Sequence, residues 1–306
     1  MNRAPRAWLL AAAAVSVGLA LPATATAQHF TESVCPDDAH AAFHVCARAV
    51  VSDPPRMADG RPDFSGYWRR RGWAFEDLEA HPETADDFGG PSVVVDPPDG
   101  KVPIQPWAEA QRQKNREQYM HHNAACILSG PAGTMYMTSR FQFIQDESTL
   151  VMVGEQLTAH PYRIIPLDGK PYIGDIPQWN GDPRGRWEGD TLVIEARNHN
   201  GKYLLDQRGR FLTGEARIVE RMTRLDENTI HYEATFEDPN VFTRPFTIAF
   251  GFRRDATENP EIWEEACHET NAEQLALFRN LGYRVFPGIT GEQARTLKAA
   301  WEEEQR

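Results

Sequence analysis

The chain of 306 residues carries 32 lysines and arginines against 44 aspartates and glutamates, a formal net charge of −12 at pH 7. The acidic residues are spread along the chain, and their surplus argues against nucleic acid or an anionic membrane surface as a partner, because both favour basic patches. A chain of this length can bury a large core as one domain, and its length agrees equally with one large β domain with appendages and with two domains.

The first 27 residues have the pattern of a secretory signal peptide. Arg3 and Arg6 precede an apolar run over residues 8–21, and residues 25–27 read Ala-Thr-Ala, a small-residue cleavage site. The apolar run is too short and too rich in alanine to be a membrane span. We therefore predict an exported product, periplasmic or secreted, with no membrane insertion after the signal is removed.

The rest of the chain divides by composition into three parts. Residues 28–60 are predicted to form an N-terminal appendage, and residues 61–271 a β domain interrupted by a loop and helix excursion at 76–138. Residues 272–306 return to helix-forming composition. Helices are predicted at 39–49, 107–119, 272–281 and 290–305.

From residue 139 to residue 268, apolar runs alternate with short polar turns. The turns lie at 145–149, 167–170, 188–191 and 225–229. Each is flanked by residues of high β propensity, so each is predicted to connect a hairpin. The fold class is therefore mainly β, an antiparallel meander closed into a barrel or folded into a sandwich, with peripheral helices.

Four cysteines follow the signal segment: Cys35, Cys46, Cys126 and Cys267. In an oxidising compartment an even number favours disulfide bonds, and four cysteines allow three connectivities. The sequence favours a local Cys35–Cys46 bond and a Cys126–Cys267 bond that ties an early segment to the last strand.

The alternation of side chains along a strand separates core positions from solvent positions. Within residues 229–236, one face carries Ile230, Tyr232, Ala234 and Phe236. The opposite face carries His231 and Glu233, which are predicted to be solvated.

Three charged residues share a face with apolar neighbours: Glu155, Arg244 and Glu265. Such groups must pair, lose their charge or line a wet cavity. One interpretation is a structural ion pair of Arg244 with Glu265 or Glu155. The other is a polar patch in a barrel mouth, where a desolvated glutamate acts as general acid or base and an arginine holds an oxyanion or carboxylate.

His160 lies close to Glu155 in sequence, in a β context. A lone histidine in such a place is more often a hydrogen-bonded structural residue, but histidine ordinarily titrates near neutral pH, which keeps it among the acid–base candidates. The chain contains no HExxH, GxSxG, P-loop or GxGxxG motif and no paired CxxC. We therefore predict no cofactor and assign no metal ligands, but metal dependence stays open, because His160 and inward carboxylates could combine in space in a way the sequence does not show.

Several short motifs follow one another in a fixed order along the chain. They are RIIPLDGKP at 163–171, GRWEGDTLVI at 185–194, VER at 219–221, DP at 238–239 with TRP at 243–245, and EACHE at 265–269. The series, from Asp63 to Asn271, resembles a large family of exported, uncharacterised bacterial β-rich proteins. The resemblance implies a lipocalin-like barrel and no established reaction. Two residues depart from the family pattern: His199 stands where the family has phenylalanine, and Thr270 stands where it has glycine. Because of these two differences, the resemblance does not imply a shared ligand.

Two functional hypotheses follow from these residues. The first is a cofactor-independent enzyme, a lyase, hydratase, isomerase or hydrolase acting on a hydroxylated or aromatic small molecule. Its predicted catalytic residues are Glu155, His160 and Glu265, and its predicted substrate-binding residues are Arg163, Arg244, Trp187 and Trp263. The alternative is a periplasmic carrier that holds an apolar small molecule in the same pocket. A scaffold role would need neither pocket nor ligand.

Overall fold

The computed structural model describes residues 31–36, 40–70, 74, 76–84, 88–155, 161–264 and 266–306, with the backbone alone at 122, 123 and 270. The predicted signal segment and two of the predicted catalytic residues, His160 and Glu265, lie outside the described residues.

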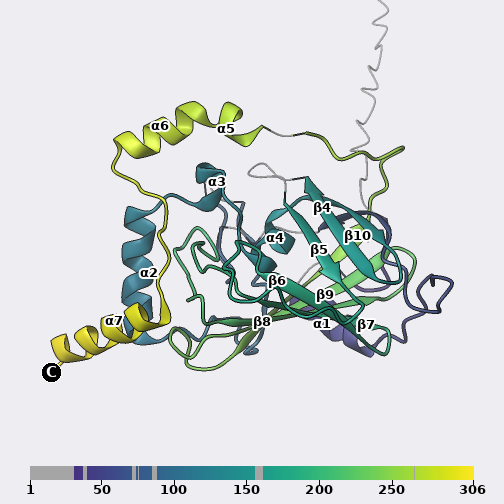
Figure 1. The fold of residues 1–306 in the computed structure, drawn as a ribbon, viewed down its shortest axis with the longest axis horizontal. Coiled ribbons are helices and arrows are strands. Elements are labelled where there is room, and N and C mark those ends of the chain that lie inside the picture. The colour runs from purple at the N-terminus through teal and green to yellow at the C-terminus, as the bar shows by residue number, and fades with distance from the viewer. Residues whose placement is uncertain are drawn as a thin grey trace, which may run out of the picture.

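One antiparallel sheet curves into a nearly closed barrel (Figure 1). Its strands are β1 (Gly66–Arg70), β2 (Val94–Asp96), β3 (Arg140–Gln145), β4 (Thr149–Glu155), β5 (Tyr162–Pro166), β6 (Asp182–Glu188), β7 (Thr191–Arg197), β8 (Arg217–Arg224), β9 (Thr229–Glu237) and β10 (Phe246–Arg254). The main ladder runs β5-β4-β3-β1-β10-β9-β8-β7-β6, and β2 pairs with β10 beside it. The prediction of a mainly β fold is confirmed, and its shape is consistent with a lipocalin-like barrel.

Strand β1 joins the two meanders of the barrel. It pairs with β3 on one side and with β10 on the other, so the first strand links the start of the β3–β5 meander to the end of the β6–β10 meander. Its Trp68 is fully buried and donates its indole N–H to the Phe64 carbonyl at 2.8 Å. Within the described residues, β5 and β6 are the two ends of the ladder, and they meet as a seam.

Three of the four predicted turns connect hairpins. The turns between β3 and β4, β6 and β7, and β8 and β9 each join paired strands. Gly189, at the β6–β7 corner, has a φ of 61°, which glycine adopts without steric cost. The prediction for 167–170 is wrong, because β5 does not pair with β6 and residues 167–181 instead form an excursion along the seam.

The barrel interior is filled mainly by aromatic side chains from β3, β9 and β10. They are Phe141, Phe143, Tyr232, Phe236, Phe246, Phe250 and Phe252, all at most 1% exposed. The predicted inward face of residues 229–236 is confirmed, since Ile230 and Ala234 are also fully buried. Close packing of this kind leaves the interior as a core and not as an open ligand chamber.

Helix α1 (His40–Ala49) packs on the outer face of the barrel, against β10 and β9 (Figure 1). Its Phe43 lies 5.7 Å, between ring centroids, from His231 of β9. The prediction that His231 is solvated is therefore wrong: its side chain is 2% exposed because α1 covers it. The predicted Cys35–Cys46 disulfide is confirmed and holds the segment before α1 to the helix.

The remaining helices lie outside the barrel wall or at its end. They are α2 (Pro106–Gln118), α3 (His122–Ala125), α4 (Pro131–Met137), α5 (Cys267–Thr270), α6 (Ala272–Asn280) and α7 (Gly291–Glu304). All seven residues of α4, which the sequence did not predict, are buried. None of the helices in the described residues is long and apolar enough to cross a membrane.

Helices α5 and α6 form a strap that lies beside α3 at the top of Figure 1, apart from the barrel strands. Helix α6 buries none of its side chains. The predicted Cys126–Cys267 disulfide is confirmed and fastens the start of the strap to the segment after α3. The disulfide bond therefore anchors the strap, whereas other helices of the molecule are anchored by buried apolar side chains.

We expect the double variant Cys126→Ser/Cys267→Ser to release the strap while the barrel stays folded. Limited proteolysis within 266–282 should become roughly tenfold faster, because local opening needs little free energy where few side chains are buried. Mass mapping of the fragments and the β signal in circular dichroism would measure this. The matched control is Cys35→Ser/Cys46→Ser, which should leave the strap cleavage rate unchanged; equal rates in all proteins would contradict the anchoring role.

Candidate functional site

A charged pair crosses the barrel interior from β5 to β8. Arg163 donates from Nη1 and Nη2 to the two carboxylate oxygens of Glu220, at 2.7 and 2.6 Å. Tyr232 of β9 donates its hydroxyl to the same carboxylate at 2.8 Å. The side chains of Arg163 and Glu220 are 1% and 0% exposed, so this is a fully desolvated bidentate ion pair.

The environment holds Arg163 and Tyr232 each in one protonation state. Burial alone would lower the pKa of Arg163, but the Glu220 carboxylate raises it above its ordinary value. Burial, and then the charge of Glu220, raise the pKa of the Tyr232 hydroxyl well above its ordinary value. Arginine therefore stays charged and tyrosine stays a donor, so the cluster suits positioning and not proton transfer.

Removing one partner of this pair should destabilise the barrel strongly. Glu220→Gln leaves the Arg163 charge buried without a counter-charge, which costs about 3–5 kcal/mol in the free energy of unfolding. Urea denaturation would measure the loss. The double variant Arg163→Met/Glu220→Gln should recover a large part of it. If the double variant is as unstable as Glu220→Gln, the unpaired charge of Arg163 is not the cause of the lost stability.

A cleft of about 680 Å³ opens at the seam between β5, β6 and the excursion that connects them. Its lining is mainly apolar, with a few polar and charged groups. The lining residues are Leu128, Tyr162, Arg163, Ile164, Pro166, Lys170, Ile173, Pro177, Gln178, Trp179, Asn180, Gly181, Asp182, Pro183 and Arg184. This volume is in the range of small-molecule sites.

The outward side chains of β5 give the cleft its apolar rim. Tyr162 and Ile164 are exposed because they lie on the outward face of β5, and Ile173 of the excursion is exposed beside them. Arg163, between the two outward residues, turns inward to Glu220. Its Nε is buried and has no hydrogen-bond partner among the described residues, although Arg163 is one of the residues that line the cleft.

The charged groups at the other side of the cleft are already paired. Asp182 is 2% exposed, accepts a hydrogen bond from the Ile173 amide at 2.5 Å, and pairs with Arg184. Arg184 also donates to the carbonyls of Lys170 and Pro171, which holds the excursion against β6. These contacts build the cleft wall and leave Asp182 no free oxygen for acid–base work.

A second set of contacts holds the excursion to the segment after β7. The amide of Gln178 donates to the Asn198 carbonyl, and the amide of Asn200 donates to the Gln178 carbonyl, both at 2.8 Å. Between them, His199 turns inward: its Nε2 donates to the Ala216 carbonyl at 2.9 Å, and its Nδ1 accepts from the Tyr203 hydroxyl at 3.2 Å. His199 is thus a buried, hydrogen-bonded residue.

Stability should fall with acidity through His199. Burial lowers the pKa of His199 in the folded state, so below the ordinary value near 6.5 the unfolded chain binds a proton that the folded chain refuses. The contribution of His199 to the free energy of unfolding is fully present above that pH. It is lost as pH falls, by at most about 1.4 kcal/mol per pH unit. Urea denaturation at pH 7 and pH 5 should show a smaller loss for His199→Gln; an equal loss would contradict this assignment.

The residues predicted from sequence do not converge on one site within the described chain. Glu155 lies on the outer face, 3.2 Å from Arg140 Nη1, and accepts from the Trp263 amide at 3.2 Å. It is a structural partner, as one interpretation held, but of Arg140 and not of Arg244. Arg244 is half-exposed and pairs with Asp96 at 2.6 Å.

The two predicted aromatic residues also lie apart. Trp187 packs on the core, stacked on Phe64 with ring centroids 5.9 Å apart. Trp263 is 72% exposed on the segment that leads to the strap. Arg163 alone of the described candidates lines the cleft.

The acids of the GRWEGDTLVI motif are exposed ion-pair partners. Asp190 accepts from both terminal nitrogens of Arg56, at 2.8 and 2.7 Å. The hydrogen bond from Arg221 lowers the pKa of Glu188, so this carboxylate stays ionised at neutral pH. The motif forms the turn of the β6–β7 hairpin. Its Asp190 also holds the N-terminal segment to the barrel through the ion pair with Arg56.

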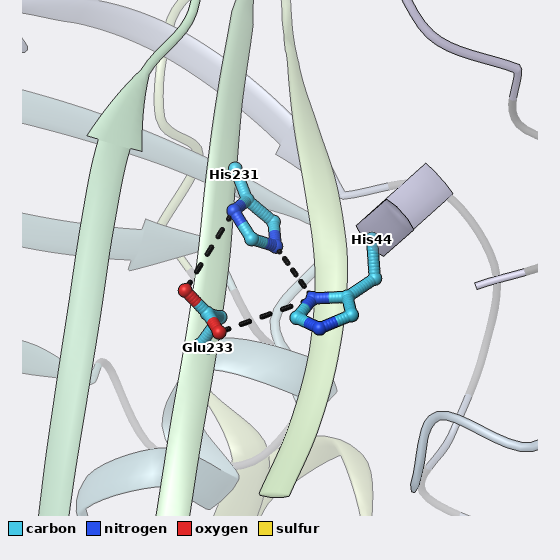
Figure 2. A group of neighbouring side chains, drawn as sticks. All are labelled: His44, His231 and Glu233. Atoms are coloured by element: carbon cyan, nitrogen blue, oxygen red, sulfur yellow. Dashed lines mark hydrogen bonds and ion pairs between the residues drawn. The ribbon is translucent and has the colours of Figure 1, made fainter. Parts of the chain in front are cut away.

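A separate group of three side chains lies under α1: His44 of the helix with His231 and Glu233 of β9 (Figure 2). His44 Nδ1 and His231 Nε2 are 3.1 Å apart. The ligand atoms of all three lie within 4.8 Å of one another, and this donor set is one that transition metals accept.

Sequence reasoning missed Glu220 and this histidine group for different reasons. Glu220 shares an inward face with Ile218 and Met222, so the parity rule applied to β8 would have found it. The histidine group depends on α1 lying over β9, which no local pattern reports. Comparisons with family models, with curated proteins and with solved structures find no match.

Proposed function

We propose that the protein is a small-molecule carrier whose ligand occupies the seam cleft. The observation that carries this proposal is the exposed apolar rim of Ile164 and Ile173 beside the unsatisfied Nε of Arg163. An apolar or aromatic molecule with one oxygen acceptor fits that combination, because the rim gains from burial and the donor gains a partner. Trp179 and Tyr162 add flat surfaces for a ring.

The acid–base enzyme stays a prediction. A general acid or base must lie within hydrogen-bond reach of the ligand and be free to exchange a proton. Among the described residues of the cleft, Asp182 is occupied by the Ile173 amide and Arg184, and Glu155 lies on the outer face in a pair with Arg140. The geometry therefore favours binding over turnover.

Export to the periplasm or the medium belongs to the same proposal. The signal-like residues 1–27 support it, as do the two disulfide bonds, which persist in oxidising compartments. A carrier of apolar molecules has a use in an aqueous compartment where its ligand dissolves poorly. The family that the motifs resemble is likewise one of exported proteins.

The binding of 1-anilinonaphthalene-8-sulfonate, an apolar ring system with an anionic group, tests the cleft. We expect one saturable site, and Ile164→Asp should weaken it roughly tenfold, because a charge replaces about 1.5–3 kcal/mol of apolar contact. Fluorescence titration would measure the affinity, and native mass spectrometry would identify any co-purified molecule.

Ile144→Asp is the matched control. Ile144 is 51% exposed on β3 and Ile164 is 54% exposed on β5, but only Ile164 lines the cleft. The control should bind the probe as the parent does. Equal weakening in both variants would show non-specific surface binding, and chemical conversion of a co-purified molecule by the protein would overturn simple carriage.

A further inference from the structure

His44, His231 and Glu233 bring two imidazoles and one carboxylate together on the outer face of the barrel, remote in sequence from the seam. Figure 2 shows His44 approaching from α1 and the other two side chains approaching from β9. His231 and Glu233 are two residues apart on one strand, so they point to the same face. The side chains of His44 and Glu233 are 14% and 12% exposed, which leaves the group open to an ion from solvent.

The separations suit a common metal ion. His44 Nδ1 lies 3.1 Å from His231 Nε2 and 3.9 Å from Glu233 Oε1, and both distances are shorter than two zinc–ligand bonds of about 2.0–2.1 Å placed end to end. The carboxylate needs to move toward His231 Nε2 by roughly 1 Å at most to share the same ion.

The Glu233 carboxylate has the freedom for that movement. Its distances are 3.7 Å to Arg48 Nη1, 3.8 Å to His231 Nδ1 and 3.9 Å to His44 Nδ1, all longer than a hydrogen bond. Arg48 is 66% exposed and carries the nearest positive charge, and its long side chain can turn to solvent when a cation binds.

The two facing imidazole nitrogens share one hydrogen bond. His44 Nδ1 and His231 Nε2 are 3.1 Å apart, so one of them carries the proton of that bond. A metal ion that binds both nitrogens displaces this proton.

We propose that His44, His231 and Glu233 form a binding site for one divalent transition-metal ion, with zinc as the best match. Two imidazoles, one carboxylate and a water molecule complete a tetrahedral zinc shell. The ion joins α1 to β9 at the point where the helix covers the sheet, so it stabilises the appendage on the barrel. This site is independent of the seam cleft and of the ligand proposed there.

Isothermal titration of the untagged full chain with zinc chloride tests the site. We expect one saturable equivalent, with an affinity at least tenfold lower in His44→Gln and in Glu233→Gln, since each loses one ligand. His268→Gln, at an exposed histidine outside the cluster, is the control and should bind as the parent does. Circular dichroism confirms that each variant is folded.

A second measurement separates a specific site from surface binding. Zinc should raise the unfolding temperature of the parent, because an ion that binds only the folded chain stabilises it, and should raise it much less in His44→Gln. Absence of a saturable equivalent in the parent would overturn the proposal. So would unchanged affinity in both ligand variants, which would leave His44 and His231 as a hydrogen-bonded neutral pair.

Discussion

The bidentate pair between Arg163 and Glu220 is the constraint on which the barrel depends. Strand β5 ends the ladder on one side, and no β6 ladder holds it from the other, so its inward side chains must fix its position. Arg163 does so by reaching Glu220 of β8 across the interior, where Tyr232 completes the shell of the carboxylate. The buried Glu220 carboxylate has two well-aligned partners, Arg163 and Tyr232, and therefore tolerates little displacement. The ion pair thus fixes the position of the seam.

The cleft is a consequence of that seam. A barrel closed by hydrogen bonds would pair the outer edge of β5, but here the excursion after β5 lies along that edge instead. Asp182 and Arg184 hold the excursion on one side, and the backbone around His199 holds it on the other. Among the described residues the interior is packed with aromatic rings, and the proposed ligand is therefore assigned to the seam.

The outer face of the barrel carries a second polar group for an unrelated reason. Helix α1 covers β9 and takes His231 out of solvent, and the Cys35–Cys46 disulfide stiffens the segment that brings the helix there. A polar residue on a covered face needs a partner, which His44 provides at 3.1 Å. The appendage and the barrel therefore share a polar contact that a bare sheet would have left to water.

Several local features could be predicted from the amino-acid sequence: the alternation that buries Tyr232, the glycine corner at 189, the helices at 272–280 and 291–304, and the two disulfide pairings that the sequence favoured. The first three follow from strand and helix periodicity and from turn chemistry, which a short window reports, whereas the even number of cysteines only favoured disulfide bonds and left three connectivities open. The packing of distant segments is what leaves β5 and β6 unpaired, makes Glu220 the partner of Arg163 and lets α1 bury His231. Each of these contacts depends on which surface is covered by a segment that is distant in sequence. The periodicity of residues along the chain does not indicate that surface.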